Sequence, residues 1–417
     1  MKKLILFSAL LFATTEYTAQ VEQEWTERTP YPGAGRHHPV TMVFGQNAYL
    51  LTGTTNTRTI NNDVFRYNAP ADSWTQVNAF PGPARSFAYG DTLNGKGYMG
   101  FGLGPNNRFL DDLWEFDPEN ETWSELASCP CRGRRHPAFI AHQGKIFVGQ
   151  GDNNVLGNMN DWWEYDIATD SWRELPDLPG PVRHHPFHFA IGDYVYTGMG
   201  HGNNNSSGQL QIYRDWYRWD PAEEEWTTMS NFPRQARVAG TQFSNRDKGY
   251  VLSGDGSNHG TMATGEFWEY DPETDSWEEL PPHPGVSRWA PHSFVVGDTV
   301  YFTSGQVRNG NPNAGLYNDV WSFPLLTEPP VSVENPVQTA EQFRVYPNPA
   351  KVEIRFKGSL IDNGPVKIDI FGVSGNLVLS TYLSEARMNV ESLSNGIYFI
   401  KLQEPSGTIK QSKFIKQ

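Results

Sequence analysis

The chain has 417 residues, a formal net charge of −14, 13% aromatic residues, 39 glycines and 30 prolines. This length exceeds what one ordinary hydrophobic core supports, so we expect at least two domains. The acidic balance argues against nucleic acid as a partner, because a phosphate backbone attracts a basic face.

The first 19 residues predict a secretory signal peptide, residues 1–19. Lys2 and Lys3 form its basic region, and Leu4 to Ala13 form its apolar stretch. That stretch has about half of the roughly 20 residues that a membrane span needs. We expect cleavage between Ala19 and Gln20 and a mature chain without a transmembrane segment.

A repeat with a period near 50 residues occupies residues 20–326. Six tryptophans mark it, each followed by an arginine 11 residues later and, from the second tryptophan on, preceded by an acid 11 residues earlier. Asp319 holds the place of the acid in the last unit, where no tryptophan follows. The tryptophans are Trp25, Trp74, Trp123, Trp172, Trp226 and Trp277. The arginines are Arg36, Arg85, Arg134, Arg183, Arg237 and Arg288, and the acids are Asp63, Asp112, Asp161, Asp215, Glu266 and Asp319. Such a period in β-rich units indicates a propeller.

Each unit carries four short strand signals, here called a to d. In the third unit they span residues 136–142, 145–149, 162–166 and 171–175. The last unit ends its strand c at Phe323 and has no tryptophan strand after it, whereas Trp25 stands before the first strand a. We therefore expect the N-terminal strand to complete the sixth blade as its strand d, which removes free sheet edges.

These units resemble kelch repeats. The resemblance rests on the aromatic run from Asn160 to Asp166, on the later Trp172, and on a glycine that closes strand b. The double glycine typical of kelch repeats is degraded, for example to Thr52-Gly53. The resemblance implies an all-β fold with a six-bladed kelch-type β-propeller.

The two cysteines, Cys129 and Cys131, stand in a Cys-Pro-Cys turn. We expect either a turn with two thiols or, in an oxidising compartment, a short local bridge, and less favoured is metal or redox chemistry. Two cysteines alone do not make a structural zinc site.

Residues 327–342 predict a linker that contains proline and glutamate, and residues 343–417 a small β-sandwich. The opening Tyr346-Pro347-Asn348-Pro349 and the later Asn395-Gly396-Ile397-Tyr398 closely resemble the type A sorting domain of the type IX secretion system. The resemblance implies Sec export to the periplasm, transport across the outer membrane by the type IX machinery, and release or surface attachment.

A binding face follows from the strand order. Since strands alternate in direction, the d–a links and the b–c loops share one face, and the arginines stand there at the start of strand a. The arginine-to-acid distance is 27 residues in units one to three and 32, 29 and 31 in units four to six, which indicates longer b–c loops in half the ring. The candidate ligand-binding residues are Arg36, His38, Arg134, His136, Arg183, His185, Arg288, Asn204, Asn258 and Asn311.

Two interpretations of these residues remain. Guanidinium forks suit the carboxylate of an acidic ligand, but each arginine could instead pair with the recurring acid of its repeat or with neighbouring backbone. His38, His136 and His185 occupy one equivalent position in units one, three and four. Three histidines on separate blades could also hold a metal ion, although our main expectation is no metal ligand and no cofactor.

The chain lacks the fingerprints of serine hydrolases, zinc proteases, P-loops and dinucleotide sites. We therefore expect an exported or cell-surface binding module for a protein or carbohydrate ligand on the d–a and b–c face. The alternative is a sugar-processing enzyme similar to sialic acid mutarotase (N-acetylneuraminate epimerase), a six-bladed kelch propeller.

Overall fold

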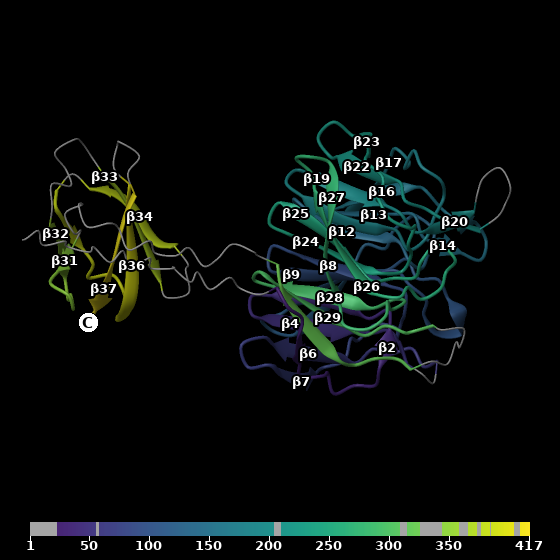
Figure 1. Ribbon diagram of the computed structural model, residues 1–417, viewed down its shortest axis with the longest axis horizontal. Coiled ribbons are helices and arrows are strands. Elements are labelled where there is room, and N and C mark those ends of the chain that lie inside the picture. The colour runs from purple at the N-terminus through teal and green to yellow at the C-terminus, as the bar shows by residue number, and fades with distance from the viewer. Residues whose placement is uncertain are drawn as a thin grey trace, which may run out of the picture. The chain divides into compact units, whose positions relative to one another are not determined.

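The computed structural model describes residues 23–55, 58–203, 210–308, 315–325, 344–357, 366–372, 377–383, 385–403 and 409–417. The predicted signal peptide and the predicted linker lie outside these residues. The chain divides into two compact units, Met1–Pro329 and Pro330–Gln417. The first unit holds six four-stranded antiparallel sheets (Figure 1).

Each sheet is one blade of a propeller. Blade one contains β3 (Val40–Phe44), β4 (Asn47–Leu51), β6 (Val64–Asn68) and β7 (Ser73–Val77). Blade two contains β8 (Tyr89–Leu93), β9 (Lys96–Gly100), β10 (Leu113–Asp117) and β11 (Thr122–Leu126). Blade three contains β12 (Ala138–His142), β13 (Lys145–Gly149), β16 (Trp162–Asp166) and β17 (Ser171–Leu175).

The second half of the ring repeats this pattern. Blade four contains β18 (Phe187–Ile191), β19 (Tyr194–Gly198), β22 (Trp216–Asp220) and β23 (Glu225–Met229). Blade five contains β24 (Thr241–Asn245), β25 (Lys248–Leu252), β26 (Gly265–Asp271) and β27 (Ser276–His283). Blade six contains β28 (His292–Val296), β29 (Thr299–Thr303), β30 (Val320–Pro324) and the N-terminal β1 (Thr26–Arg28).

The ring is closed by the N-terminal strand, as predicted. In blade six, Glu27 of β1 pairs with Trp321 of β30 in antiparallel register. The first strands of the blades contact one another in a cycle, β3 to β8, β12, β18, β24, β28 and back to β3, which places them around the axis. In blade three the predicted strands b, c and d coincide with β13, β16 and β17.

Strand a of blade three begins two residues later than predicted, at Ala138. His136 has a left-handed backbone, with φ 55°, and Pro137 has no N–H to donate. Neither residue can continue a regular ladder, so the d–a link extends through both of them.

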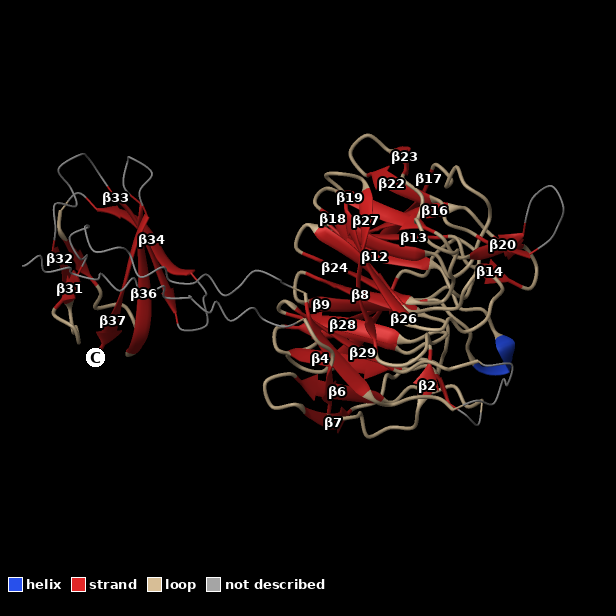
Figure 2. Cartoon of the chain, viewed as in Figure 1, coloured by secondary structure: helices blue, strands red, loops and turns tan. Residues whose placement is uncertain are grey.

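The longer loops lie together on one side of the propeller, around β2, β14 and β20 (Figure 2). They hold the short strand pairs β2 (Arg36–His37) with β5 (Thr54–Thr55), β14 (Asp152–Asn153) with β15 (Gly157–Asn158), and β20 (His201–Asn203) with β21 (Leu210–Ile212). A 3-10 helix, η1 (Pro105–Asn107), lies in the b–c loop of blade two. Bridges such as Arg135 to Asp152 and His184 to His201 join the d–a links to the b–c loops, as expected for one shared face.

The glycine after strand b links neighbouring blades. In all six blades it has a left-handed backbone, which glycine adopts without steric cost. A Cβ at Gly151 would lie 2.7 Å from the carbonyl oxygen of Arg135, so no other residue fits there. Gly151 donates its N–H to the carbonyl of Arg183 in the next blade, at 2.9 Å, and Gly305 donates to Arg36 at 2.8 Å, which closes the cycle.

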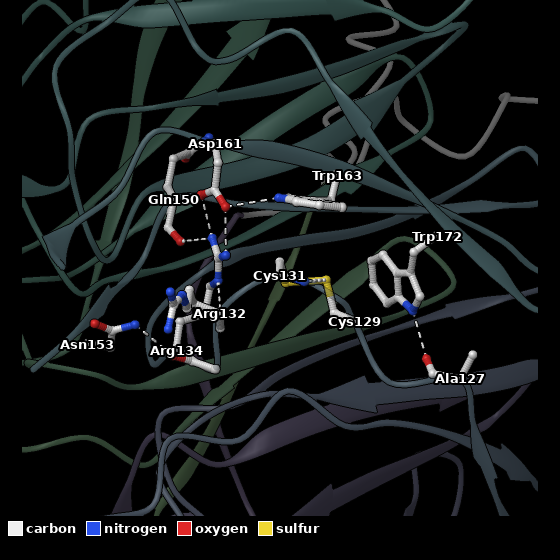
Figure 3. Close-up of a disulfide and its surroundings, with 11 residues drawn as sticks. Ala127, Cys129, Cys131, Arg132, Arg134, Gln150, Asn153, Asp161, Trp163 and Trp172 are labelled. Carbon is white, nitrogen blue, oxygen red and sulfur yellow. Dashed lines mark hydrogen bonds and ion pairs between the residues drawn. A yellow bond between two sulfur atoms is a disulfide. The ribbon is translucent and has the colours of Figure 1, made fainter. Parts of the chain in front are cut away.

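The tryptophan of strand d also ties two blades together. Trp172 donates its indole N–H to the carbonyl of Ala127, in the link that precedes blade three, at 2.7 Å (Figure 3). Asp170 accepts the N–H of the same Ala127 at 2.8 Å. Asp72 and Trp74 hold Thr29 in the same way. The backbone of each of these two links is thereby satisfied by the blade beside it.

The second unit is a two-sheet sandwich. One sheet contains β31 (Arg344–Tyr346), β32 (Glu353–Lys357) and β35 (Arg387–Asn389). The other contains β34 (Leu377–Leu383), β33 (Val366–Gly372), β36 (Gly396–Gln403) and β37 (Ile409–Lys416), in this spatial order. Buried residues of both sheets, including Ile354, Ile368 and Phe414, form one core.

Candidate functional site

The six repeat arginines are buried and ion-paired. Arg134 is fully buried and forms two parallel hydrogen bonds with Asp161, Nη1 to Oδ1 at 2.6 Å and Nη2 to Oδ2 at 2.7 Å (Figure 3). Its Nη1 also donates to the carbonyl of Gln150 at 2.9 Å. Trp163 donates to the second carboxylate oxygen of Asp161 at 2.9 Å. Both terminal nitrogens of the Arg134 guanidinium group therefore have hydrogen-bond partners within blade three.

Four further blades repeat this fork. The pairs are Arg36 with Asp63, Arg85 with Asp112, Arg183 with Asp215, and Arg288 with Asp319. Blade five has Glu266 in place of aspartate, and only Nη2 of Arg237 reaches it. Burial lowers the pKa of Arg237 to about 10. This geometry favours the structural interpretation of the arginines, and ligand binding by Arg36, Arg134, Arg183 and Arg288 stays a prediction.

Two residues after each arginine, six residues form a ring around the axis, called here the axial ring. Each has a left-handed backbone, with φ between 50° and 62°. The members are His38, Phe87, His136, His185, Ala239 and Ala290. Backbone N–H groups bond to the neighbouring member, from His185 to His136 at 3.0 Å and from Ala290 to Ala239 at 2.7 Å. The surrounding blades thus hold a conformation that is costly for residues other than glycine.

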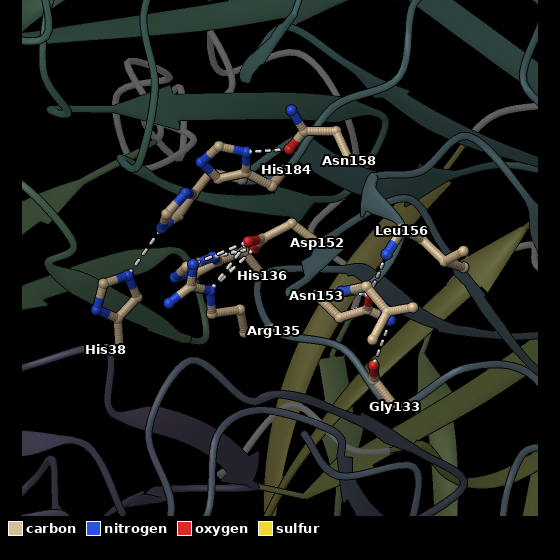
Figure 4. Close-up of polar contacts among 11 residues, drawn as sticks. His38, Gly133, Arg135, His136, Asp152, Asn153, Leu156, Asn158 and His184 are labelled. Atoms are coloured by element: carbon tan, nitrogen blue, oxygen red, sulfur yellow. Dashed lines mark hydrogen bonds and ion pairs between the residues drawn. The ribbon is translucent and has the colours of Figure 1, made fainter. Parts of the chain in front are cut away.

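The three histidines of the axial ring meet at its centre. The Nε2 atoms of His38 and His185 lie 2.9 Å apart, and the rings of His136 and His185 stack with centroids 3.5 Å apart. His136 faces Asp152 through Nδ1, at 3.1 Å (Figure 4). Burial lowers the pKa of His136 to about 4 and takes those of His38 and His185 well below 6.5. The three rings are neutral at pH 7 and bring no positive charge to this face.

An axial cavity of about 410 Å³ lies on the far side of the ring, toward the a–b turns. Residues of all six strands a line it, among them Asp91, His188, Gln242 and His292. Burial raises the pKa of Asp91 to about 6, although Ala141 and Thr92 donate backbone N–H groups to its carboxylate. The sequence analysis did not single out these residues. The feature of the sequence that could have pointed to them is the occurrence of polar side chains within otherwise apolar strands.

A second cavity, of about 660 Å³, opens on the predicted loop face between blades four and five. We call it the loop-face cavity. Its lining residues are Pro181, Gln211, Ile212, Tyr213, Arg214, Asp215, Asn231, Gln235, Ala236 and Ser257. Tyr213 is buried beneath it, and the guanidinium of Arg183 lies 4.9 Å from the centre of its ring.

The predicted asparagines relate to this cavity in different ways. Asn258 is exposed and directly follows Ser257 of the cavity wall. Asn204 and Asn311 lie outside the described residues. The amide residues Asn231 and Gln235, which sequence analysis missed, come from the link between β23 and β24.

Cys129 and Cys131 are joined by a disulfide in the link between blades two and three (Figure 3). Of the two alternatives left by the sequence, the structure contains the bridge. An oxidised pair is consistent with a chain that leaves the reducing cytoplasm.

Comparison with protein families finds two matches. The Attractin/LZTR1 beta-propeller family matches residues 48–311, and the family of secretion system C-terminal sorting domains matches residues 344–417. The second match indicates type IX secretion to the cell surface or beyond it. The described part of the chain holds no helix with the length and hydrophobicity that a membrane crossing requires.

Comparison with curated proteins finds no match. Among solved structures, the one titled "Structure of YjhT" is similar, with a TM-score of 0.56 and 16% sequence identity, over 63% of this chain and 89% of that chain. At this identity the likeness shows the fold alone.

Proposed function

This chain belongs to the Attractin/LZTR1 β-propeller family and ends in a type IX sorting domain, and we propose that it is an exported carbohydrate-binding protein. The proposed binding site is the loop-face cavity between blades four and five. The observation that carries the proposal is the chemistry of its wall. Amide, hydroxyl and guanidinium groups converge there on a concavity of about 660 Å³.

Such a wall suits a polyhydroxylated ligand. Each asparagine or glutamine side chain offers both donors and an acceptor, and a sugar hydroxyl can use either. Asn231 and Gln235 are exposed at the cavity, and Arg214 adds a guanidinium group there. The volume lies within the roughly 300–1,000 Å³ that is usual for small-ligand sites.

The sugar-processing alternative has weaker support. A general acid or base in this wall would need a titratable group that is not already engaged. Among the described lining residues the one carboxylate is that of Asp215, and both of its oxygens accept hydrogen bonds from Arg183. We therefore favour binding over catalysis.

A glycan array probed with the full chain tests this proposal. We expect binding to a defined group of glycans, with affinity reduced about thirtyfold in the Asn231→Ala and Gln235→Ala double variant, because two hydrogen bonds at about 1 kcal/mol each are lost. Gln46→Ala removes an exposed amide from an a–b turn on the other face and should bind as the unmodified chain does.

No binding above background by the unmodified chain would contradict the proposal, and so would equal affinity of the double variant. The same samples can be assayed for interconversion of sialic acid anomers. A rate above that of the uncatalysed reaction would favour the enzymatic alternative.

A further inference from the structure

The histidine cluster of the axial ring has the composition of a metal site. His38, His136 and His185 come from three different blades, and one ring nitrogen of each lies within 4.8 Å of the other two. All three side chains are about 5% exposed or less. Among the described residues no other group of three histidine, cysteine or acidic side chains brings its ligand atoms together in this way. We propose that these three histidines bind one divalent transition-metal ion of the zinc class.

His136 is oriented as a metal ligand would be. Its Nδ1 faces the carboxylate of Asp152, so the ring hydrogen belongs on Nδ1 and Nε2 keeps its lone pair. This buried Nε2 has no hydrogen-bond partner. Leaving a buried acceptor unpaired destabilises the fold, and coordination of an ion removes that penalty. A carboxylate on the distal nitrogen is also the usual partner of a metal-bound imidazole.

Asp152 is itself held in place. Arg135 donates to it through Nη2 at 2.9 Å and through Nε at 3.1 Å (Figure 4). The carboxylate is therefore held in position on Nδ1 of His136 when Nε2 of the same ring takes up an ion. Arg135, Asp152 and His136 form a chain of hydrogen bonds from the loops to the axis.

His185 supplies a second unpaired nitrogen. Its Nδ1 is buried without a partner, while its Nε2 contacts Nε2 of His38 at 2.9 Å. Imidazoles around a tetrahedral zinc ion, with zinc–nitrogen distances of about 2.0–2.1 Å, place their nitrogens roughly 3.4 Å apart. The Nε2 atoms of His38 and His185 lie 2.9 Å apart, and the ligand atoms of all three rings lie within 4.8 Å of one another. Formation of the site therefore requires rotation of the stacked His136 and His185 rings, whose centroids lie 3.5 Å apart.

Space for an ion exists beside the cluster. Blades five and six contribute Ala239 and Ala290 to the axial ring, and a cavity of about 10 Å³ there borders His38 and His185. That is close to the volume of one water-sized probe. Magnesium and calcium prefer oxygen ligands, whereas neutral imidazoles suit zinc, copper and nickel. Zinc would join blades one, three and four across the axis.

The test uses the full chain, without a histidine tag, freed of metal by a chelator and then titrated with zinc. We expect one zinc per chain by elemental analysis and calorimetry, and a raised midpoint of thermal unfolding. His136→Ala should lower zinc affinity at least tenfold, and Asp152→Asn by about 10–100-fold. His142→Gln, which alters a histidine of the axial cavity that lines neither the cluster nor the small cavity beside it, should keep full stoichiometry.

X-ray absorption on the unmodified zinc-loaded chain keeps the proposal testable where a variant fails to fold. The expected spectrum shows imidazole nitrogen ligands at about 2.0–2.1 Å. A shell of oxygen ligands alone would overturn the proposal, as would the absence of bound zinc. The neighbouring rings of His184, His201 and His259 lie 4.9 and 5.0 Å apart. Zinc retained by His136→Ala but lost by His201→Ala would assign the ion to that group and refute ours.

Discussion

The guanidinium group of Arg134 donates hydrogen bonds to both carboxylate oxygens of Asp161, at 2.6 and 2.7 Å. Arg134 lies in a d–a link and Asp161 directly precedes strand c, so the pair fixes the loop face of blade three to its sheet. Repetition of the fork around the ring explains why arginine and acid recur together. The presence of both residues in every unit is therefore a requirement of blade construction.

Asp161→Asn should therefore destabilise the propeller. Arg134 is fully buried, and removing one partner of a buried ion pair costs about 3–5 kcal/mol. Urea unfolding followed by tryptophan fluorescence measures the loss. Arg132→Ala, at an exposed arginine two residues away, is the control and should change stability by less than about 0.5 kcal/mol. Equal stability of the two variants would refute a structural role for the fork.

Trp172→Ala should lower the free energy of unfolding by about 3 kcal/mol. This is the lower end of the range for a large aromatic residue, because the side chain is only partly buried. Trp172→Phe keeps most of the packing and loses the hydrogen bond to Ala127. We expect this variant to lower the free energy of unfolding by about 1 kcal/mol. The same urea titration separates the two effects. A loss below about 1 kcal/mol for the alanine variant would show that this tryptophan does not hold neighbouring blades together.

Acid should weaken the propeller between about pH 6.5 and pH 4. Burial lowers the pKa of His188 and of His292 to about 4, so in this range the unfolded chain binds protons that the folded chain does not. The free energy of unfolding then falls as the pH falls, by about 2 kcal/mol per histidine at pH 5. Asp91, with its pKa raised to about 6, acts in the opposite direction and stabilises the fold as it is protonated.

Free energies of unfolding measured at pH 7 and pH 5 test these opposite effects of the histidines and of Asp91. His188→Gln should lose less stability on acidification than the unmodified chain, and Asp91→Asn should lose more. An unchanged pH dependence in His188→Gln would contradict the assignment.

The sorting domain should be needed for export and not for folding of the propeller. Its core is separate, and its family match begins at residue 344. A chain ending at Glu328 should fold and remain in the periplasm, as cell fractionation and protease accessibility on whole cells would show. Normal surface delivery of this shortened chain would contradict the prediction.

The repeat made the fold predictable because its signals are local. Strands, turns and the tryptophan spacing lie within single units, and in blade three the predicted strands b, c and d have the observed bounds. The partner of Arg134 was harder to choose, since spacing alone does not show whether the fork faces a carboxylate or a ligand. The loop-face cavity was missed because residues of blade four and of the following link build it together. The left-handed backbone of His136 was unexpected because that conformation is uncommon outside glycine.

Carbohydrate binding in the loop-face cavity is the central claim, and hydrogen–deuterium exchange of the full chain with a glycan selected on the array tests it most directly. We predict slower exchange at residues 211–214 and 231–236 when the glycan is bound, with no change in the a–b turn at residues 45–46. Protection confined to the a–b and c–d turns would place the ligand on the opposite face and contradict the account.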